Sequence, residues 1–502
     1  MRPDRRQRLA AIAAVLTVAM GMRLWLLFTH TYVLFVDETF QYLEPAHRLA
    51  FGSGIVTWEY IDGIRSWLLP EIIAAVMRLA VWIDPSPATY VGVVRVGCVA
   101  LSLVLPYVGF RVGERAGGLA GGVVVGLLGA VWYEALYFAP VVMTEPLAAH
   151  LALLGLWLGE QAPAARRRLV VAGALLGVTT VLRFQYAPAL ALAVLWQQRR
   201  TPTALGTMVL AGGATIGLLG GGLDALTWGM PFQSVWLNIE RNAIQGVGAA
   251  MGAEPWWFPF GYFAAAWGPA LPLLLGLAVL GARRFPALAI AALATLALHA
   301  LTPHKEVRFF YLAIAATPML IGLGAVRAGA WLRGPGLRHR RLQLAGAVAA
   351  AALLAGTEAA TALTGATPPD AWHRYASTLH AFAAARVQPG LCGLGVRHGY
   401  VYTSGGYTYL HRDVPIYFEA FGQSQVLPGS AFRLRLRIVR DGRDVPQVPD
   451  AAFASAGRLF NVMVGRPQDA LPGFAPAACF GAGTPDDERL CVFRRPGTCQ
   501  PP

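Results

Sequence analysis

Charged side chains are scarce in this chain, and lysine is almost absent. Asp, Glu, Lys and Arg make up 14% of its 502 residues, whereas about a quarter is usual for a soluble domain. With 56% hydrophobic residues and a mean hydropathy of +0.50, this scarcity excludes a single soluble domain, a collagen and a disordered chain. Of the 41 basic residues, 40 are arginine and one is lysine, Lys305.

Long apolar runs are abundant and predict an α-helical polytopic membrane protein. The first run, residues 9–28, is too long for the core of a signal peptide and lacks an A-x-A cleavage site. We therefore expect an uncleaved helix with its N-terminal tail in the cytoplasm. About 11 membrane helices are expected in all, since a span needs roughly 20 residues and the shorter blocks can form a hairpin. The later blocks cover residues 89–110, 118–139, 147–158, 169–182, 186–196, 204–227, 259–280, 286–301, 309–326 and 342–363.

Five arginine clusters between these blocks fit one topology, in which all five face the cytoplasm. The fit requires that residues 67–83 lie on the membrane surface and that the two short blocks on either side of Arg183 form a hairpin. Because the formal charge of +14 is concentrated in these clusters and not along one basic face, no nucleic-acid partner is expected. The segments on the opposite face are then residues 31–66, 140–146, 228–258, 302–308 and 366–502.

The end of the chain differs in composition and predicts a second domain. Residues 1–365 are expected to form the membrane domain, and residues 366–502 a small soluble domain of mixed α/β structure. Apart from Cys98, which lies within a span, every cysteine falls in this second domain. No C-x-x-C pattern occurs, so a zinc site is not expected. An even number of cysteines suits disulfides in an oxidising compartment, but the sequence does not assign the pairing of Cys392, Cys479, Cys491 and Cys499.

The first external loop is rich in acidic residues, although the whole chain has 27. Asp37 and Glu38 lie directly beyond the first membrane helix, where a carboxylate can take a proton from a hydroxyl nucleophile. The alternative is that these are solvated loop charges, and the loop alone does not decide between the two. The same loop carries Glu44, His47, Trp58, Glu59 and Arg65.

A second group of polar and aromatic residues lies in the external loop at residues 228–258. Asn238 and Asn242 are one helical turn apart and therefore share a face. Trp256 and Trp257 follow them. Paired tryptophans at a membrane boundary serve either as interfacial anchors or as a surface on which a sugar stacks. The composition does not separate these two roles.

Positive charge on the external face is the third candidate feature. His304, Lys305 and Arg308 lie within five positions at the mouth of a helix, on the face where positive charge is disfavoured. A bound lipid phosphate would explain them, since Arg offers directional contacts to phosphate oxygens and Lys a point charge. Arg183, at the apex of the short hairpin, is an intramembrane arginine that is either functional or part of a structural salt bridge.

Taken in order, these motifs resemble those of the glycosyltransferase family 22 mannosyltransferases. These are polytopic GT-C enzymes that build GPI anchors and dolichol-linked oligosaccharides, together with their bacterial relatives. The family's D-E, F-Q and L-E-P-A-H segments correspond to residues 37–47, its T-W-E segment to residues 57–59 and its H-K-E-x-R-F segment to residues 304–309. In place of the family's His-Pro before the acidic pair, this chain has Phe35 and Val36.

The resemblance implies a GT-C fold and the transfer of mannose from polyprenyl-phosphate mannose, with inversion, to a hydroxyl of a lipid-linked or membrane-proximal glycan. It implies Asp37 as the general base, with Glu38 next, and no required cofactor, although the clustered carboxylates leave a divalent metal open. The donor phosphate would be bound by His304, Lys305, Arg308 and Arg183. The acceptor or sugar would be bound by Glu44, His47, Trp58, Glu59, Arg65, Asn238, Asn242 and Trp256.

Two other functions stay open at this point. One is a GT-C transferase that uses another polyprenyl-phosphate sugar, such as glucose or arabinose. The other is a transporter of lipid-linked sugars, although the two homologous halves expected of a transporter are not found in the sequence. The abundance of Ala, Gly and Arg suggests a GC-rich bacterial genome. We therefore expect a protein of the bacterial cytoplasmic membrane with its active site facing the periplasm, in contact with membrane lipids, the lipid donor and the glycan acceptor.

Overall fold

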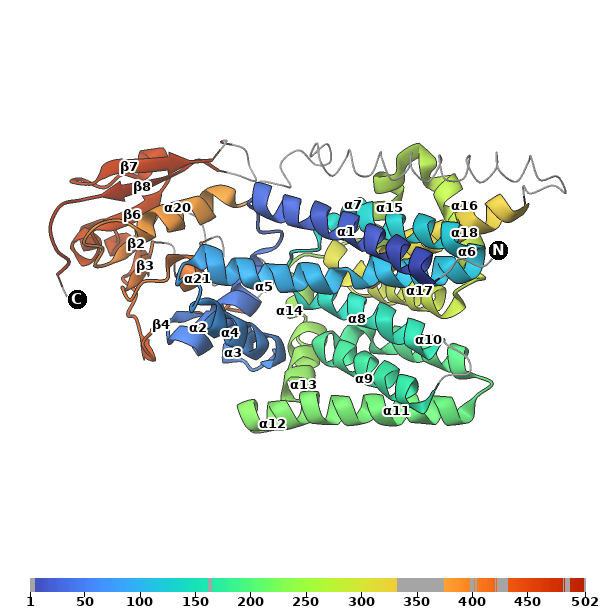
Figure 1. Ribbon diagram of the computed structural model, residues 1–502. Helices are drawn as coiled ribbons and strands as arrows, with labels where there is room; N and C mark the ends of the chain where they lie inside the picture. The colour runs from blue at the N-terminus through green and yellow to red at the C-terminus, as the bar shows by residue number, and fades with distance from the viewer. Residues whose placement is uncertain are drawn as a thin grey trace.

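Apolar helices form one end of the molecule and a small β-sheet region forms the other (Figure 1). The computed structural model describes residues 5–160, 165–331, 374–397, 401, 404–419, 421, 432–481, 483 and 488–500. The prediction of a polytopic α-helical membrane protein is confirmed, while the span expected at residues 342–363 lies outside the described residues. Within the described residues, five helical segments are long and apolar enough to cross a membrane: Arg5–Thr29, Pro87–Val131, Pro202–Trp228, Phe258–Ala282 and Val307–Ala330.

The N-terminal helices pack around a tight reversal of the chain. They are α1 (Arg5–Thr29), α5 (Pro87–Ser102), α6 (Val104–Val131) and α7 (Tyr133–Tyr137). α6 is interrupted at Gly117 and Gly118, and Gly118 has a φ of +68°, a left-handed conformation that favours glycine. The two halves of α6 run antiparallel and very close, since a Cβ on Gly113 would lie 2.3 Å from the carbonyl oxygen of Gly121.

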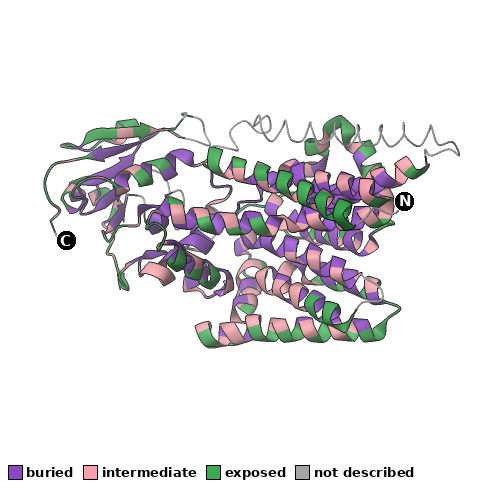
Figure 2. Ribbon diagram, in the orientation of Figure 1, coloured by how far each residue is buried: buried purple, intermediate pink, exposed green. Residues whose placement is uncertain are grey.

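The middle of the chain forms a layer of antiparallel helices. It consists of α8 (Thr144–Gly159), α9 (Arg166–Leu182), α10 (Ala187–Gln198) and α11 (Pro202–Ile216). The chain reverses between α9 and α10 at Arg183 and the short 3-10 turn Phe184–Tyr186 (Figure 1), as the hairpin prediction requires. α11 leaves apolar side chains such as Val209 and Leu210 exposed on its outer face (Figure 2), which suits contact with lipid.

The remaining helices complete the bundle and include the loops at residues 228–258 and 302–308. They are α12 (Leu223–Trp228), α13 (Gln233–Ile239), α14 (Val247–Ala250), α15 (Phe258–Trp267), α16 (Leu271–Ala282), α17 (Pro286–Leu301) and α18 (Tyr311–Trp331). α16 and α18 pack closely, because a Cβ on Gly281 or on Gly324 would lie 1.9 Å from a backbone oxygen of the other helix. Small residues at such contacts let membrane helices approach each other.

Residues 38–80, which include most of the first loop, fold into short elements. A π-helical turn, Glu38–Leu43, leads into α2 (Glu44–Phe51), β1 (Gly54–Val56), α3 (Trp58–Ile61) and α4 (Leu68–Ala80). α4 buries Ile73 and Met77 and exposes the apolar Ile72 and Leu79 beside the charged Glu71 and Arg78. A helix of this kind suits the membrane surface, which is where the topology required residues 67–83 to lie.

The C-terminal region contains a mixed sheet, as expected for an α/β domain. The strand order is β3-β2-β6-β8-β7, with β2 parallel to both neighbours and β8 antiparallel to both of its own. Two disulfides, Cys392–Cys499 and Cys479–Cys491, pair the four cysteines. The boundary expected at residue 366 lies outside the described residues. The elements are α20 (Ala376–Arg386), β2 (Leu394–Val396), α21 (Gly406–Leu410), β3 (Ile416–Phe418), β6 (Val462–Gly465), β7 (Ala475–Phe480) and β8 (Leu490–Arg494).

A second sheet joins the C-terminal region to the first external loop. Its order is β1-β4-β5, where β4 is Arg437–Arg440 and β5 is Arg443–Asp444. β1 pairs antiparallel with β4, with Ile55 opposite Ile438. This pairing holds the C-terminal region against the loop that carries Asp37, a contact that the sequence did not predict.

Candidate active site

A cavity of about 520 Å³ lies where the first loop (residues 31–66), the turn at Arg183 and the loops before α14 and α18 meet. Its volume falls within the roughly 300–1,000 Å³ that is common for small-molecule sites. The structure brings nine of the side chains predicted from the sequence to its wall: Asp37, Trp58, Glu59, Arg65, Arg183, Asn238, Asn242, His304 and Arg308. Segments that are far apart in the sequence therefore share one polar chamber.

Asp37 stands at the start of the π-helical turn that follows the first membrane helix. Its side chain is 20% exposed and its Oδ2 accepts a hydrogen bond from Arg308 Nη2. This charge-assisted contact holds the carboxylate at the cavity wall.

Arg308 lies on the 3-10 turn that begins the last described membrane segment, and it is the centre of the site. Arg308 is 5% exposed, and its Nε lies 2.8 Å from Glu306 Oε2. Its Cζ lies 4.6 Å from the centre of the Phe35 ring. The aromatic residue that replaces the family's histidine thus makes a cation–π contact with this arginine.

Glu145, at the start of α8, links the two arginines of the cavity. It is 1% exposed, and its Oε1 lies 3.4 Å from Arg183 Nη1 and 3.8 Å from Arg308 Nε. Both guanidinium groups also lie against Phe309, with Cζ atoms 4.8 and 5.2 Å from its ring centre. Glu145 was not among the predicted site residues, because the sequence predicts a loop at residues 140–146, whereas the structure begins α8 at Thr144.

His304 and Glu306 form an ion pair at the rim of the cavity. His304 Nε2 lies 3.1 Å from Glu306 Oε1, and His304 Nδ1 lies 2.7 Å from the carbonyl oxygen of Gly252. The hydrogen bond to Glu306 raises the pKa of His304 against the effect of burial. Burial raises the pKa of Glu306, but the charge of Arg308 and the hydrogen bonds from His304 and Arg308 outweigh it and lower this pKa to about 2.

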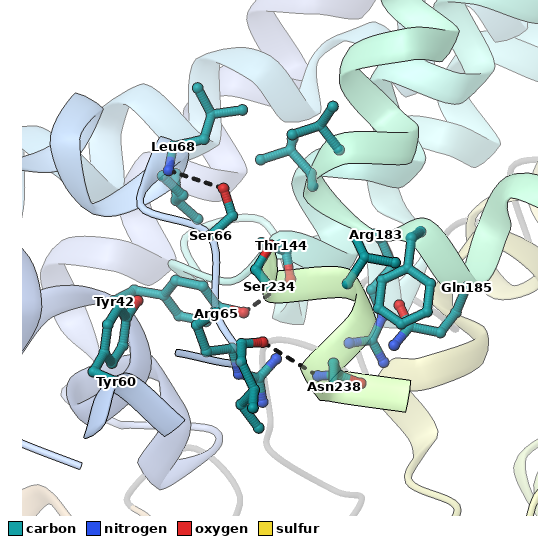
Figure 3. Close-up of a pocket in the computed structure, with 16 residues that line it drawn as sticks. Tyr42, Tyr60, Arg65, Ser66, Leu68, Thr144, Arg183, Gln185, Ser234 and Asn238 are labelled. Atoms are coloured by element: carbon teal, nitrogen blue, oxygen red, sulfur yellow. Dashed lines mark hydrogen bonds between the residues drawn. The ribbon is translucent and has the colours of Figure 1, made fainter. Parts of the chain in front are cut away.

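A polar recess of about 50 Å³ continues the cavity between the first loop and α13. Figure 3 shows Arg65, Arg183 and Asn238 around this recess, which Tyr42 and Thr144 also line, with 2.8 Å between their hydroxyl oxygens. Asn238 donates a hydrogen bond to the carbonyl oxygen of Ile64 at 3.5 Å (Figure 3). The asparagine therefore ties α13 to the first loop as well as lining the cavity.

Glu59 and Gln41 form a further polar patch on the cavity wall. Gln41 Nε2 donates a hydrogen bond to Glu59 Oε1 at 3.0 Å. Burial raises the pKa of Glu59, and the nearby charge of Arg65 opposes this. Such convergent polar groups in a pocket are suited to orienting the hydroxyls of a sugar.

The structure does not bring Lys305 to the cavity, contrary to the expectation of a phosphate contact. The residue is 5% exposed, and its Nζ donates hydrogen bonds to the carbonyl oxygens of Glu254 at 2.6 Å and Pro303 at 3.4 Å. Its positive charge is thus directed at backbone oxygens. Lys305 fastens the loop before α18 to the loop before α15.

Four other predicted residues also lie away from the cavity wall. Glu38 is buried and pairs with Arg95 at 2.6 Å. Glu44 accepts hydrogen bonds from the backbone of Ile55 and Thr408, and burial raises its pKa to about 7.

Neither His47 nor Trp256 lines the cavity. His47 is buried, whereas Trp256 is exposed. His47 Nε2 lies 2.9 Å from His411 Nδ1 of the C-terminal region, and burial lowers the pKa of His47 to about 3. Trp256 is 68% exposed and packs edge-on against Phe260, as an interfacial anchor would. Among the described residues, no group of three or more His, Cys, Asp or Glu side chains is arranged to hold a metal ion.

The comparison with known protein families agrees with the resemblance that the motifs of this chain suggest. The model of the Alg9-like mannosyltransferase family matches residues 14–364. The chain belongs to the Alg9-like mannosyltransferase family. The predicted resemblance is therefore confirmed.

Curated relatives of this Alg9-like chain include GPI mannosyltransferases. GPI alpha-1,2-mannosyltransferase 3 of Mus musculus is 24% identical over 305 residues, which cover 59% of this chain and 55% of the relative. GPI mannosyltransferase 3 of Drosophila melanogaster is 26% identical over 292 residues, which cover 54% of this chain and 49% of the relative. The chain spans about half the length of the curated relatives it matches.

A solved structure shares the fold of this Alg9-like chain. ArnT from Cupriavidus metallidurans, crystallised bound to undecaprenyl phosphate, aligns with a TM-score of 0.62 at 13% sequence identity. The alignment covers 99% of this chain and 98% of that chain. The expected GT-C fold is thereby confirmed.

Proposed function

We propose that this chain transfers mannose from a polyprenyl-phosphate mannose to a hydroxyl of a lipid-linked or membrane-proximal glycan. The observation that carries the proposal is the meeting of Asp37, Arg308 and Arg183 in one cavity. These residues provide a base and two cations, which are the groups that a lipid-phosphate donor and a hydroxyl nucleophile require.

The proposed step is an inverting displacement at the anomeric carbon. The acceptor hydroxyl oxygen bonds to C1 of mannose while the bond from C1 to the phosphate oxygen breaks, and its electron pair leaves with the polyprenyl phosphate. The hydroxyl proton passes to the carboxylate of Asp37. Arg308 and Arg183 offset the charge that develops on the leaving phosphate, where cations in a water-poor site are most effective.

The position of Arg308 supports a single arrangement of base and leaving group. Its guanidinium bonds to Asp37 and lies near Glu145, the acid that it shares with Arg183. One side chain thus orients the base and reaches toward the phosphate end of the cavity. His304, at the rim, is a further donor to a phosphate oxygen in this proposal.

The known relatives support the donor class. Two curated relatives are named as GPI mannosyltransferases, and the ArnT structure holds undecaprenyl phosphate. The proposal includes a bacterial cytoplasmic membrane and a cavity that faces the periplasm, where membrane lipids deliver the donor. It requires no cofactor.

The test is an assay of the purified chain with polyprenyl-phosphate mannose, glucose and arabinose, each combined with glycolipids extracted from membranes. We expect a mass increase of one hexose with the mannose donor alone, and no change when EDTA is added. Formation of a product that contains arabinose or glucose would indicate that the chain is a GT-C transferase that uses another sugar donor. Movement of the lipid-linked sugar across a vesicle membrane without any covalent product would identify a transporter and overturn the proposal.

A further inference from the structure

The C-terminal region contributes a wall to the cavity. Leu434 lines the same chamber as Asp37 and is 9% exposed. It belongs to a small apolar cluster with Trp58, Ile64 and Val247. The ring of Phe432 meets the ring of Trp58 edge-on, with centres 5.2 Å apart. The membrane domain alone therefore does not enclose the site.

Ion pairs and strand pairing hold this wall in place. Arg435 pairs with Asp62 of the first loop, and Asp62 also lies 3.1 Å from Arg241 beyond α13. The side chain of Asp62 is 2% exposed, so one buried carboxylate joins three segments around the cavity. The pairing of β1 with β4 begins two residues after Arg435. Leu434 is thus positioned by contacts on both sides.

We propose that Leu434, with Phe432 behind Trp58, sets the size of the glycan acceptor that reaches Asp37. The inference rests on the proposed function. In an inverting displacement the nucleophile approaches C1 opposite the leaving group, so in this proposal the acceptor lies on the side of the donor sugar that faces the base Asp37. Trp58 and Leu434 both line the cavity and carry no charge. An aromatic plane beside an aliphatic side chain matches the apolar face of a sugar ring.

The experiment compares acceptors of different size with the full chain in nanodiscs. Polyprenyl-phosphate mannose is the donor, and octyl α-mannosides with one, two or three mannose units are the acceptors. Leu434→Trp narrows the chamber, and we expect it to lower kcat/KM for the three-unit acceptor relative to the one-unit acceptor by about tenfold. Leu434→Ala widens the chamber and shifts this ratio in the opposite direction. The KM for the donor stays within about twofold, since the phosphate end is unchanged.

Leu436→Ala is the matched control. Leu436 lies two residues further along, is 7% exposed and belongs to the main core, so its truncation costs stability without changing the chamber. An unchanged acceptor ratio in both Leu434 variants, or an equal shift in Leu436→Ala, would overturn the inference while leaving the transferase intact. If the wild-type chain transfers mannose neither to these three acceptors nor to glycolipids extracted from membranes, the proposed function fails, and the inference fails with it.

Discussion

Asp37 shares Arg308 with two other carboxylates, and this sharing decides what its replacement should do. Asp37→Asn keeps the size of the side chain and its place beside the guanidinium but removes the proton acceptor. We expect kcat to fall by about 10²–10⁴-fold, with normal insertion and folding. Initial rates of mannose transfer at saturating donor measure this.

An aspartate outside the cavity is the control for that substitution. Asp84 accepts hydrogen bonds from Ser86 and Thr89 at the start of α5, and Asp84→Asn is expected to retain activity. Turnover of Asp37→Asn within a few fold of wild type would remove Asp37 from the role of base.

Glu145 is the residue whose charge keeps two arginines together. Without its carboxylate, Arg183 and Arg308 repel each other, and their geometry around a phosphate is lost. Glu145→Gln is expected to raise the KM for the lipid donor about tenfold and to change kcat less, as steady-state kinetics would reveal. Glu160→Gln is the matched control, because Glu160 ends the same helix, pairs with Arg115 at 3.9 Å and lies outside the cavity. Equal effects of the two substitutions would show that Glu145 acts only through stability.

The His304–Glu306 pair predicts a pH dependence of stability. The pKa of His304 is raised above 6.5 in the folded protein, so its contribution is fully present below pH 6.5 and is lost as the pH rises through the folded pKa. Glu306, with a pKa of about 2, stays ionised over this range. Thermal unfolding between pH 6 and 9 should show a decline in Tm that His304→Gln abolishes. A decline of the same size in the variant would assign the effect to other groups.

Most of the ionisable residues that line the cavity could be identified from the sequence, since ionisable side chains stand out in an apolar chain. The direction in which each side chain points could not be predicted from the sequence. Lys305 and Arg308 are three positions apart, yet one meets backbone carbonyls and the other the carboxylate of Asp37. The roles of Asp37 as base and of Arg183 and Arg308 in phosphate binding stay predictions, which Asp37→Asn and Glu145→Gln test.

At the scale of elements, the contact between α16 and α18 depends on glycine. A Cβ at Gly281 would lie 1.9 Å from the carbonyl oxygen of Leu320, so Gly281→Ala forces the helices apart. Overpacking of this kind costs about 1–3 kcal/mol, which thermal unfolding in detergent should register. Gly276→Ala on the same helix meets nothing within 4 Å and is expected to leave Tm unchanged or higher. Equal stability of both variants would mean that the contact is looser than described.

Hydrophobic runs predicted the helices and the reversal at Arg183, because the length and spacing of a run of apolar residues indicate its secondary structure without reference to the rest of the chain. They could not predict the pairing of β1 with β4. Both strands are very short, and Gly54 pairs with Val439 across most of the chain. A contact of this separation leaves no periodic pattern in either segment.

For the whole molecule, we predict that the N-terminus is cytoplasmic and the C-terminal region lies on the opposite side. A reporter that is active only outside the cytoplasm should work when fused after residue 500 and fail when fused before residue 5. Two disulfides in the C-terminal region fit an oxidising compartment. The reverse pattern of reporter activity would invert every loop assignment around the cavity.

Because Lys305 is buried, its reactivity toward acylating reagents can report opening of the loops around it. Acylating reagents modify lysine amines, and this chain has a single lysine. Its amine is covered while the carbonyls of Glu254 and Pro303 hold it. A mass increase at Lys305 would therefore report the moment at which the loops before α15 and α18 separate, without any engineered label.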